Sequence, residues 1–276
     1  VQLDPKLEGF STAWFEGRSG NIPLAWSITF FILVTLFVLF FIYHRFVLPT
    51  PSEDRSTLTR SGNLFLHEFW IIFKSFFQKE NIGPALAFLL LFRLGESQII
   101  KLAAPFLLDS RAVGGLGLTT GNVGLIFGTV GMVGLTLGGI LGGLAAARKG
   151  LKYWLWPMVI AMNLPNLLYV YLAYVMPESL VLISVSVFLE QFGYGFGFTA
   201  YMLFMIYFSE GKHKTAHYAI STGIMALGMM LPGMISGWVQ EVVGYQNFFI
   251  WVVLCTIPGF IVLKFLKINP AFGVRK

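Results

Sequence analysis

The chain has 276 residues, of which 56% are hydrophobic and only 12% are charged, and its formal net charge is +6. Soluble domains carry about 25% charged residues, so this composition excludes an ordinary water-soluble domain and predicts a membrane protein. The single cysteine excludes an intrachain disulfide.

The chain opens with a polar stretch, residues 1–23, which we expect to be a periplasmic loop inside a longer protein. Further along, seven apolar segments are each long enough to cross about 30 Å of hydrocarbon, which takes roughly 20 helical residues. The sequence therefore predicts an all-α membrane protein with seven transmembrane helices. These cover residues 24–47, 82–108, 122–147, 153–175, 180–208, 216–240 and 246–267.

Residues 49–81, between the first two predicted helices, are interpreted as a cytoplasmic linker. The second part of this linker, residues 64–80, is amphipathic, because Phe69, Phe73 and Phe76 recur at helical spacing opposite a polar face. This pattern predicts a helix on the inner membrane surface, and a helix packed against protein is the alternative.

The last six predicted helices, within residues 82–268, divide into two sets of three. Three crossings end on the side of the membrane opposite to their start, so the second set is an inverted copy of the first. Inverted repeats of this kind are a recurring architecture of transporters. Residues 269–276 then form a cytoplasmic tail.

Lys and Arg residues are distributed unevenly over the predicted loops. Most of the 19 fall on the side that carries the linker and the carboxy terminus, whereas Arg93 and Lys101 fall within a helix. Positively charged loops face the cytoplasm, so this asymmetry predicts a multi-pass protein whose carboxy terminus is cytoplasmic. The same asymmetry explains the basic composition, so we expect a lipid bilayer and no nucleic acid as the partner.

Four charged residues fall inside predicted helices: Arg93, Glu96, Lys101 and Glu190. An isolated charge at the centre of a membrane helix costs about 2.5–3.5 kcal/mol on insertion scales, so we expect these groups to face one another or a water-filled cavity. They lie at similar depths, where two positive and two negative groups can neutralise each other. Two interpretations stay open: structural salt bridges between helices, or a polar site for an ionic substrate or a proton relay.

Other polar side chains lie near these charges or at the helix ends. Gln98, Gln191 and Tyr194 flank the charges and would suit a substrate that forms hydrogen bonds. His213 and His217 have a spacing that could bind a metal on a helix, but no third ligand is evident. We therefore expect no metal site, and His217 is a candidate for a pH-sensitive gate.

Glycine predicts how the helices pack. The glycines from Gly124 to Gly142 recur at steps of three and four residues and predict a smooth face along which another helix packs closely. The run GYGFGF, residues 193–198, predicts a hinge or a close-packed kink.

Proline predicts where the helices bend. Pro165, Pro232 and Pro258 each remove a backbone donor inside a predicted helix. Asn163 and Asn166, three residues apart on either side of Pro165, share one helix face. This asparagine pair suits either helix packing or the wall of a cavity.

The segment GGLAAARKGLK, residues 142–152, resembles the loop signature of the major facilitator superfamily, in which a glycine is followed by an acidic residue and then by a basic cluster around a second glycine. Ala147 stands where the acidic residue would be. The resemblance implies that 82–268 is the carboxy-terminal half of a twelve-helix transporter, with 24–48 as its sixth helix and 49–81 as its central loop. An amino-terminal half of six helices would be its partner. The matching positions, interpreted as a gating loop, are Gly143, Arg148, Gly150 and Lys152.

Two longer segments, FRLGESQIIKLAAPFLLD (92–109) and the one that begins EQFGYGFGFTAYMLFMIYF at residue 190, are similar to the muropeptide permease (AmpG-type) branch of that superfamily. The similarity implies proton-coupled uptake of anhydromuramyl-sugar peptides across the bacterial inner membrane, without a cofactor. The alternatives are transport of another anionic solute, such as an acetyl-CoA-like compound, and a non-transporting membrane sensor or scaffold. No grouping of side chains resembles a catalytic site, so we do not expect an enzyme.

The similarity also implies roles for individual residues. Arg93 and Lys101 would face carboxylates of the substrate, and a buried glutamate would carry the proton. Tyr194 and Tyr201 would stack against sugar rings. The predicted substrate site therefore comprises Arg93, Lys101, Gln98, Gln191, Tyr194 and Tyr201, and the predicted proton-coupling set comprises Glu96, Glu190 and His217.

Overall fold

The computed structural model describes residues 22–48 and 62–274, and within these ranges every regular element is helical. The chain divides into two units, residues 1–68 and 69–276. The first unit contains α2 (Ile22–Val47), an apolar helix of 26 residues, which is long enough to cross a membrane. The predicted periplasmic loop and the first part of the predicted linker lie mostly outside the described residues.

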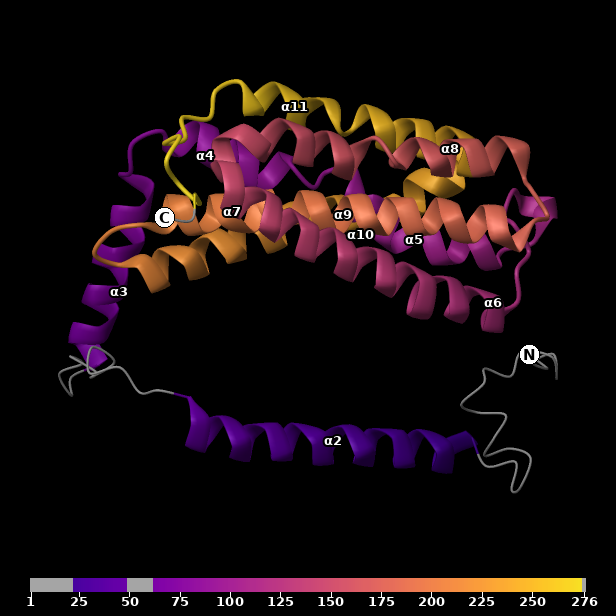
Figure 1. Ribbon diagram of the computed structural model, residues 1–276, viewed down its shortest axis with the longest axis horizontal. Coiled ribbons are helices and arrows are strands. Elements are labelled where there is room, and N and C mark those ends of the chain that lie inside the picture. Colours follow the sequence, from indigo (N-terminus) through magenta and orange to yellow (C-terminus); the bar gives the residue numbers. More distant parts are fainter. Residues whose placement is uncertain (1–21, 49–61, 275–276) are drawn as a thin grey trace. The chain divides into compact units, whose positions relative to one another are not determined.

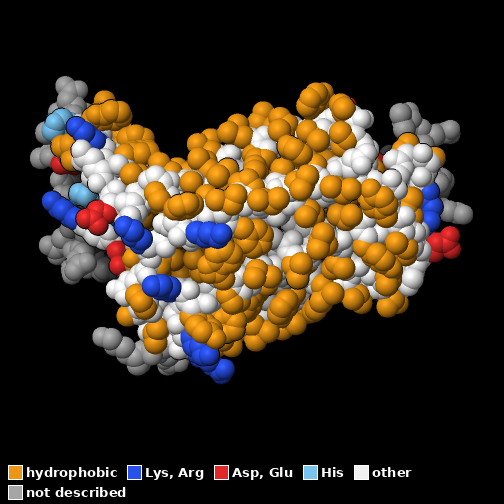
Figure 2. Space-filling model, turned by 90° about the horizontal axis from the view of Figure 1, so that it is seen from above, with side chains coloured by type: hydrophobic (Ala, Val, Ile, Leu, Met, Phe, Trp, Pro, Cys, Tyr) orange, Lys and Arg blue, Asp and Glu red, His pale blue; other side chains and the backbone are white. Residues whose placement is uncertain are grey.

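The second unit is a bundle in which α5 and α7 to α11 run along a common direction (Figure 1). Apolar side chains cover the middle of the face seen in Figure 2, and Lys and Arg side chains gather at one end of it. The elements that follow α2 are α3 (Gly62–Phe77), α4 (Ile82–Leu91), α5 (Glu96–Leu108), the 3₁₀ turn η2 (Arg111–Val113), α6 (Thr120–Leu125), the π-helical turn η3 (Ile126–Gly131), α7 (Met132–Asn163), α8 (Asn166–Val175), α9 (Leu180–Ser209), α10 (Lys214–Leu254) and α11 (Ile257–Leu263).

Long apolar helices confirm the predicted all-α membrane class. In the described part of the chain, the segments long and apolar enough to cross a membrane are Trp26–Val47, Thr120–Val175, Leu180–Ser209 and Lys214–Leu263. Two of these have 56 and 50 residues, more than one crossing needs. Each contains one glycine with non-helical dihedral angles, Gly150 in α7 and Gly244 in α10, at the places where loops were predicted. The number of seven crossings and the inverted repeats stay predictions.

The predicted continuous helix over 82–108 is instead two helices, α4 and α5, joined by a turn at residues 92–95. The Leu89 carbonyl accepts a hydrogen bond from the Tyr201 hydroxyl of α9, and the backbone N–H of Leu94 bonds to the Leu91 carbonyl in the tighter 3₁₀ pattern. The Leu94 carbonyl in turn accepts from the side chains of Ser97 and Gln98. Side chains thus satisfy backbone groups at the break, as membrane-embedded backbone requires.

Glycines bring α7 and α9 into close contact, as predicted, but along only part of the stripe. A Cβ atom added at Gly134 would lie 2.7 Å from the Phe188 carbonyl oxygen, and one added at Gly138 would collide with the Phe192 carbonyl. Gly124, in α6, has open space instead. The close-packed face therefore covers the α7 part of the stripe and not its beginning.

Helix α9 runs without interruption from Leu180 to Ser209, so the hinge or kink predicted for 193–198 is absent from it. The glycines of this run serve close packing, because a Cβ at Gly193 or Gly195 would collide with a backbone carbonyl of α7. The predicted breaks at Pro165 and Pro258 coincide with the starts of α8 and α11, whereas Pro232 lies within the continuous first part of α10.

Candidate functional site

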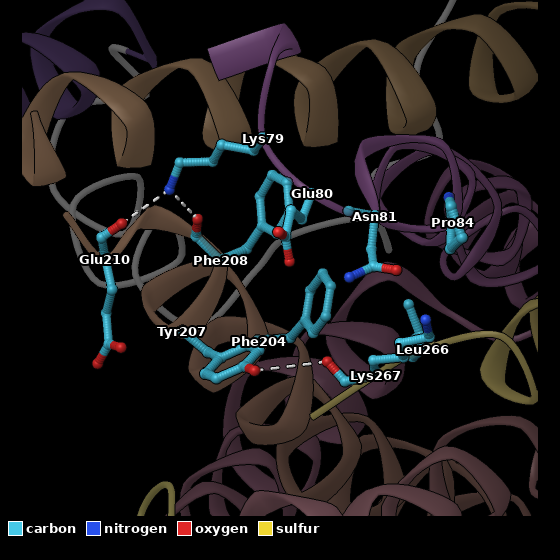
Figure 3. A pocket seen from close by; sticks show the side chains of 11 residues that line it. Lys79, Glu80, Asn81, Pro84, Phe204, Tyr207, Phe208, Glu210, Leu266 and Lys267 are labelled. Atoms are coloured by element: carbon cyan, nitrogen blue, oxygen red, sulfur yellow. Dashed lines mark hydrogen bonds between the residues drawn. The ribbon is translucent and has the colours of Figure 1, made fainter. Parts of the chain in front are cut away.

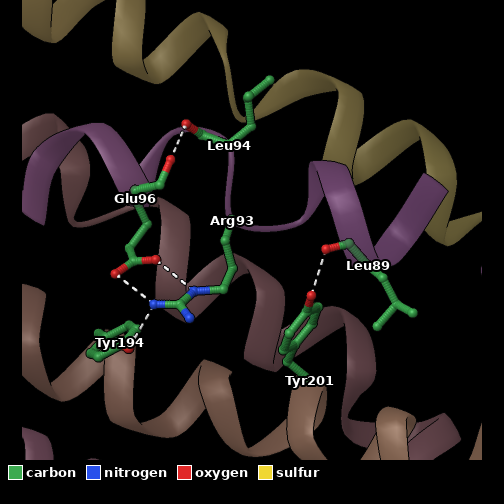
Figure 4. A network of polar contacts seen from close by, with 7 residues as sticks. Leu89, Arg93, Leu94, Glu96, Tyr194 and Tyr201 are labelled. Carbon is green, nitrogen blue, oxygen red and sulfur yellow. Dashed lines mark hydrogen bonds and ion pairs between the residues drawn. The ribbon is translucent and has the colours of Figure 1, made fainter. Parts of the chain in front are cut away.

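Arg93 and Glu96 form a buried ion pair at the α4–α5 turn, with exposures of 3% and 2%. The Arg93 Nε atom lies 2.8 Å from Oε2 of Glu96, and Nη2 lies 3.2 Å from Oε1, so the contact is bidentate (Figure 4). Nη2 also donates a hydrogen bond of 2.8 Å to the Tyr194 hydroxyl of α9. Charge-assisted bidentate contacts of this kind are strong and directional. Here they join the turn to α9.

Aromatic rings close the site around the guanidinium. The Arg93 Cζ atom lies 4.9 Å from the centre of the Phe198 ring and 5.4 Å from that of Tyr194, distances typical of cation–π contacts. Tyr201 is fully buried, with its ring stacked on Phe92 at 4.9 Å and its hydroxyl donated to the Leu89 carbonyl (Figure 4). Tyr201 therefore has no free face for a sugar in this structure, and Tyr194 is only half-buried.

Glu190 is the second buried carboxylate, and its side chain is 2% exposed. It accepts a hydrogen bond of 2.9 Å from Gln191 Nε2, and no ion pair to it occurs in the described residues. The carboxylate lines a cavity of about 480 Å³ together with Gln191, Tyr169 and Thr120. It does not pair with Arg93, contrary to the predicted mutual neutralisation of all four charges.

Lys101 is exposed on α5, whereas Arg93, Glu96 and Glu190 are buried. Its aliphatic carbons pass Gly233, where an added Cβ would lie 3.4 Å from Cγ and Cε of the lysine. Lys101 borders a separate cavity of about 380 Å³ with Met234 and other residues of α10. The four predicted charges thus occupy three places: an ion pair, a carboxylate in a cavity, and an exposed cation.

Gln98 uses both ends of its amide within the protein. Nε2 donates to the Leu94 carbonyl at 2.9 Å, and Oε1 accepts from Trp251 Nε1 of α10 at 3.0 Å. The side chain borders a largely apolar cavity of about 560 Å³ that Cys255 and Pro258 also line. A substrate would have to displace one of these partners to bond to Gln98.

His217 joins α10 to α3 at the opposite end of the bundle. Its Nε2 lies 3.0 Å from the Ser75 hydroxyl, and its buried ring packs edge-on against Phe76. His213 lies beside it, with ring centres 5.9 Å apart. Across residues 22–48 and 62–274, no three His, Cys, Asp or Glu side chains come together as metal ligands.

Lys79, which sequence reasoning missed, caps the carboxy-terminal end of α9. Its ammonium donates to the carbonyls of Phe208 and Glu210 beside a polar cavity of about 350 Å³ (Figure 3). Desolvation lowers the pKa of Lys79 below its usual value, and the nearby charge of Glu210 opposes this shift. Lys79 could have been recognised from its position beside the polar face of the predicted amphipathic helix.

The predicted gating loop lies against the end of the chain. Gly150 is buried with φ at 79°, and an added Cβ there would lie 2.9 Å from the Phe272 carbonyl oxygen. The same carbonyl accepts a hydrogen bond of 3.1 Å from the Leu151 N–H. The other members of the loop, Gly143, Arg148 and Lys152, are exposed. Residues near Phe272 therefore hold the loop, which its sequence signature did not indicate.

No protein-family model matches the chain. Among curated proteins, it is 26% identical over 199 residues to "Putative transporter AmpG 2" of Rickettsia typhi, covering 72% of this chain and 47% of that protein. It is 24% identical over 270 residues to "Putative transporter AmpG 4" of Rickettsia conorii, covering 95% and 62%. It is 28% identical over 203 residues to "Putative transporter AmpG 1" of Rickettsia prowazekii, covering 71% and 44%.

The chain spans about half the length of the curated relatives it matches. Their names describe transporters and not enzymes, in keeping with the expectation from the sequence. Apolar helices of membrane-spanning length agree with those names. Together, the similarity over most of the chain and the helical membrane fold place this protein among the relatives of the AmpG-type transporters.

Proposed function

We propose that the chain forms half of a secondary transporter that takes up cell-wall muropeptides across the bacterial inner membrane, driven by protons. The observation that supports this best is the burial of Arg93, Glu96 and Glu190 among apolar helices. Ionisable groups inside membrane segments are costly and mark substrate and ion pathways. A buried ion pair is also a poor source of stability, so stability alone gives little reason for its presence.

The proposed roles follow from the surroundings of each group. Lys101, exposed beside Ser97, is an available cation for a carboxylate of the substrate. Gln191 and Tyr194 are half-buried and supply hydrogen bonds. Glu190 carries the proton, because a buried carboxylate without a cationic partner is neutralised most simply by protonation.

The inner gate in this proposal consists of His217 and the loop with Gly143, Arg148, Gly150 and Lys152. A second half, built from the remainder of a longer protein, would supply the opposite wall of the substrate pathway. Its presence is suggested by the relatives, which are about twice as long as the matched region.

The experiment is Glu190→Gln in the full-length gene product, reconstituted in vesicles with an imposed proton gradient. We expect gradient-driven uptake of labelled anhydromuramyl peptide to be lost, while exchange of labelled for unlabelled substrate continues, since exchange needs no net proton movement. Glu178→Gln is the matched control, because Glu178 is an exposed carboxylate. Unchanged gradient-driven uptake in Glu190→Gln would refute the proposal.

The substrate class is tested at Lys101. Lys101→Met should raise KM for an anionic solute with little change in kcat, because the interaction exists already in the bound ground state. Lys212→Met, at an exposed lysine, is the control. Competition by cell-wall fragments, by other sugars and by coenzyme A thioesters then separates a muropeptide from an acetyl-CoA-like substrate.

A membrane scaffold is the second candidate, and the closed geometry of the Arg93–Glu96 pair favours it, since each charge is already neutralised within the protein. The informative change is Arg93→Met combined with Glu96→Leu, which removes both partners together. A scaffold should keep its fold and lose nothing measurable. A transporter should keep its fold and lose uptake.

A further inference from the structure

Three polar residues follow one another along a single helix face where α7 passes into α8: Asn163, Asn166 and Tyr169. They are spaced three residues apart, and the intervening Leu164 and Pro165 keep right-handed helical dihedral angles. The face is therefore continuous through the break. All three side chains are buried, with exposures of 5%, 1% and 1%.

Much of the hydrogen-bonding capacity of this face is unused. Asn163 donates through Nδ2 to the Val159 carbonyl at 2.9 Å, but its Oδ1 has no partner in the described residues. Both side-chain polar atoms of Asn166 and the hydroxyl of Tyr169 also lack partners there. These make up four of the six such buried atoms in the described chain, so the deficit is concentrated on one face. A buried polar group without a partner is destabilising, which favours a partner that is not protein.

The end of this face meets the cavity at Glu190. Tyr169 interacts with the Glu190 carboxylate without reaching a hydrogen bond of good geometry, and both side chains line the cavity of about 480 Å³. Gln191 adds a further polar group to the wall. A cavity of this volume with several polar atoms has both the space and the hydrogen-bonding groups that buried water requires.

We propose that a chain of buried water molecules runs along this face from Glu190 past Tyr169 and Asn166 to Asn163, and that it exchanges protons with Glu190. The asparagines hold the waters and do not ionise. Each water passes one proton on as it receives another, and Glu190 takes up or releases one proton at the end. The presence of the water chain does not depend on the proposed function, whereas its use in transport rests on it.

Several titratable groups surround Glu190 and would affect its exchange. Tyr169 faces it from α8, Glu96 acts on it from α5, and Tyr194 acts on it from within α9. Arg93 neutralises Glu96 through the ion pair. The test therefore alters the asparagine end of the face and leaves these groups in place.

The test is hydrogen–deuterium exchange of the Glu190 carboxyl group, followed by infrared spectroscopy of the full-length protein in acidic buffer. The band that disappears in Glu190→Gln identifies the group. Asn166→Leu, which replaces an amide by an apolar side chain of similar volume, should slow the exchange roughly tenfold, a factor that corresponds to the net free energy of about one hydrogen bond. Asn247→Leu is the control, because Asn247 is an exposed amide that donates to the Val243 carbonyl of its own helix.

Thermal unfolding of the same variants supplies the second readout. Faster or unchanged exchange in Asn166→Leu overturns the proposal at any unfolding temperature. A higher unfolding temperature also overturns it, because a dry face would gain stability when the unsatisfied amide is removed. Slower exchange with an equal or lower unfolding temperature supports it. Asn163→Leu, at the far end of the same face, decides the matter in the same way if Asn166→Leu does not fold. None of these readouts uses uptake, so failure of the transport proposal is recognised separately.

Discussion

The contact between α7 and α9 predicts a large effect of a single methyl group. Gly134→Ala would place Cβ 2.7 Å from the Phe188 carbonyl oxygen and 3.3 Å from the Phe192 N–H nitrogen. Ordinary contacts begin at 3.4 Å, so the helices must separate locally by 0.7 Å, the difference between 3.4 and 2.7 Å. Separations of that order forfeit between a quarter and a half of the dispersion energy at the contact.

Gly143→Ala is the matched control, because it lies on the same helix and an added Cβ there meets nothing within 4 Å. Both substitutions gain about 1 kcal/mol from the better helix propensity of alanine, so the difference between them isolates the packing cost. We expect that difference to be about 2 kcal/mol, within the range for overpacked cores. Gly134→Ala is therefore the less stable of the two variants.

Unfolding can be followed through the only cysteine of the chain. Cys255 is 7% exposed, so a fluorogenic maleimide should react with it only after unfolding. The assay is a thermal scan of the purified protein in detergent with both variants and the parent chain. An unfolding temperature for Gly134→Ala equal to or above that of Gly143→Ala would show that α7 and α9 do not pack as described.

Two further predictions concern the basic end of the bundle. Desolvation lowers the pKa of Lys79, so the unfolded chain binds this proton more tightly than the folded chain does. Folding stability should therefore rise with pH between the lowered pKa and the usual one. Lys79→Met should remove that rise from unfolding midpoints measured across the alkaline range, and an unaltered pH dependence would contradict the assignment. Gly150→Ala forces a side chain into a positive-φ conformation that is almost restricted to glycine, and toward the Phe272 carbonyl, at a cost of about 1–3 kcal/mol. The substitution should speed limited proteolysis at Lys267, and equal cleavage rates in parent and variant would count against the packing of residues near Phe272 on this loop.

Apolar segment length and proline positions predicted most of the helical framework. The breaks at Pro165 and Pro258 were foreseeable because proline removes a local hydrogen bond wherever its helix lies. The break at 92–95 was not, since it depends on the Tyr201 hydroxyl and on the close approach of Gly95 to the Val252 carbonyl. Contacts between residues so distant in the sequence produce no periodic pattern from which the break could be predicted.

The sequence indicated that charged side chains lie within the helices, but it did not indicate how they are arranged. The sequence placed Arg93, Glu96 and Glu190 within apolar helices, and their side chains are buried in the structure. It could not give the rotation of α5 about its axis, which directs Lys101 outward, or the turn that lets Arg93 meet Glu96. Tyr169 escaped notice because an isolated tyrosine in an apolar helix acquires meaning only from its alignment with Asn163 and Asn166.

The hydrogen bond from the Tyr201 hydroxyl to the Leu89 carbonyl couples the bend between α4 and α5 to the position of α9. Straightening α4 into α5 would return the Leu89 carbonyl to its own helical ladder and leave a buried phenol with nothing to donate to. Sliding α9 away would strand the same carbonyl in an apolar interior. Either movement alone would leave a buried polar atom without a hydrogen bond. We therefore expect the bend between α4 and α5 and the position of α9 to change together.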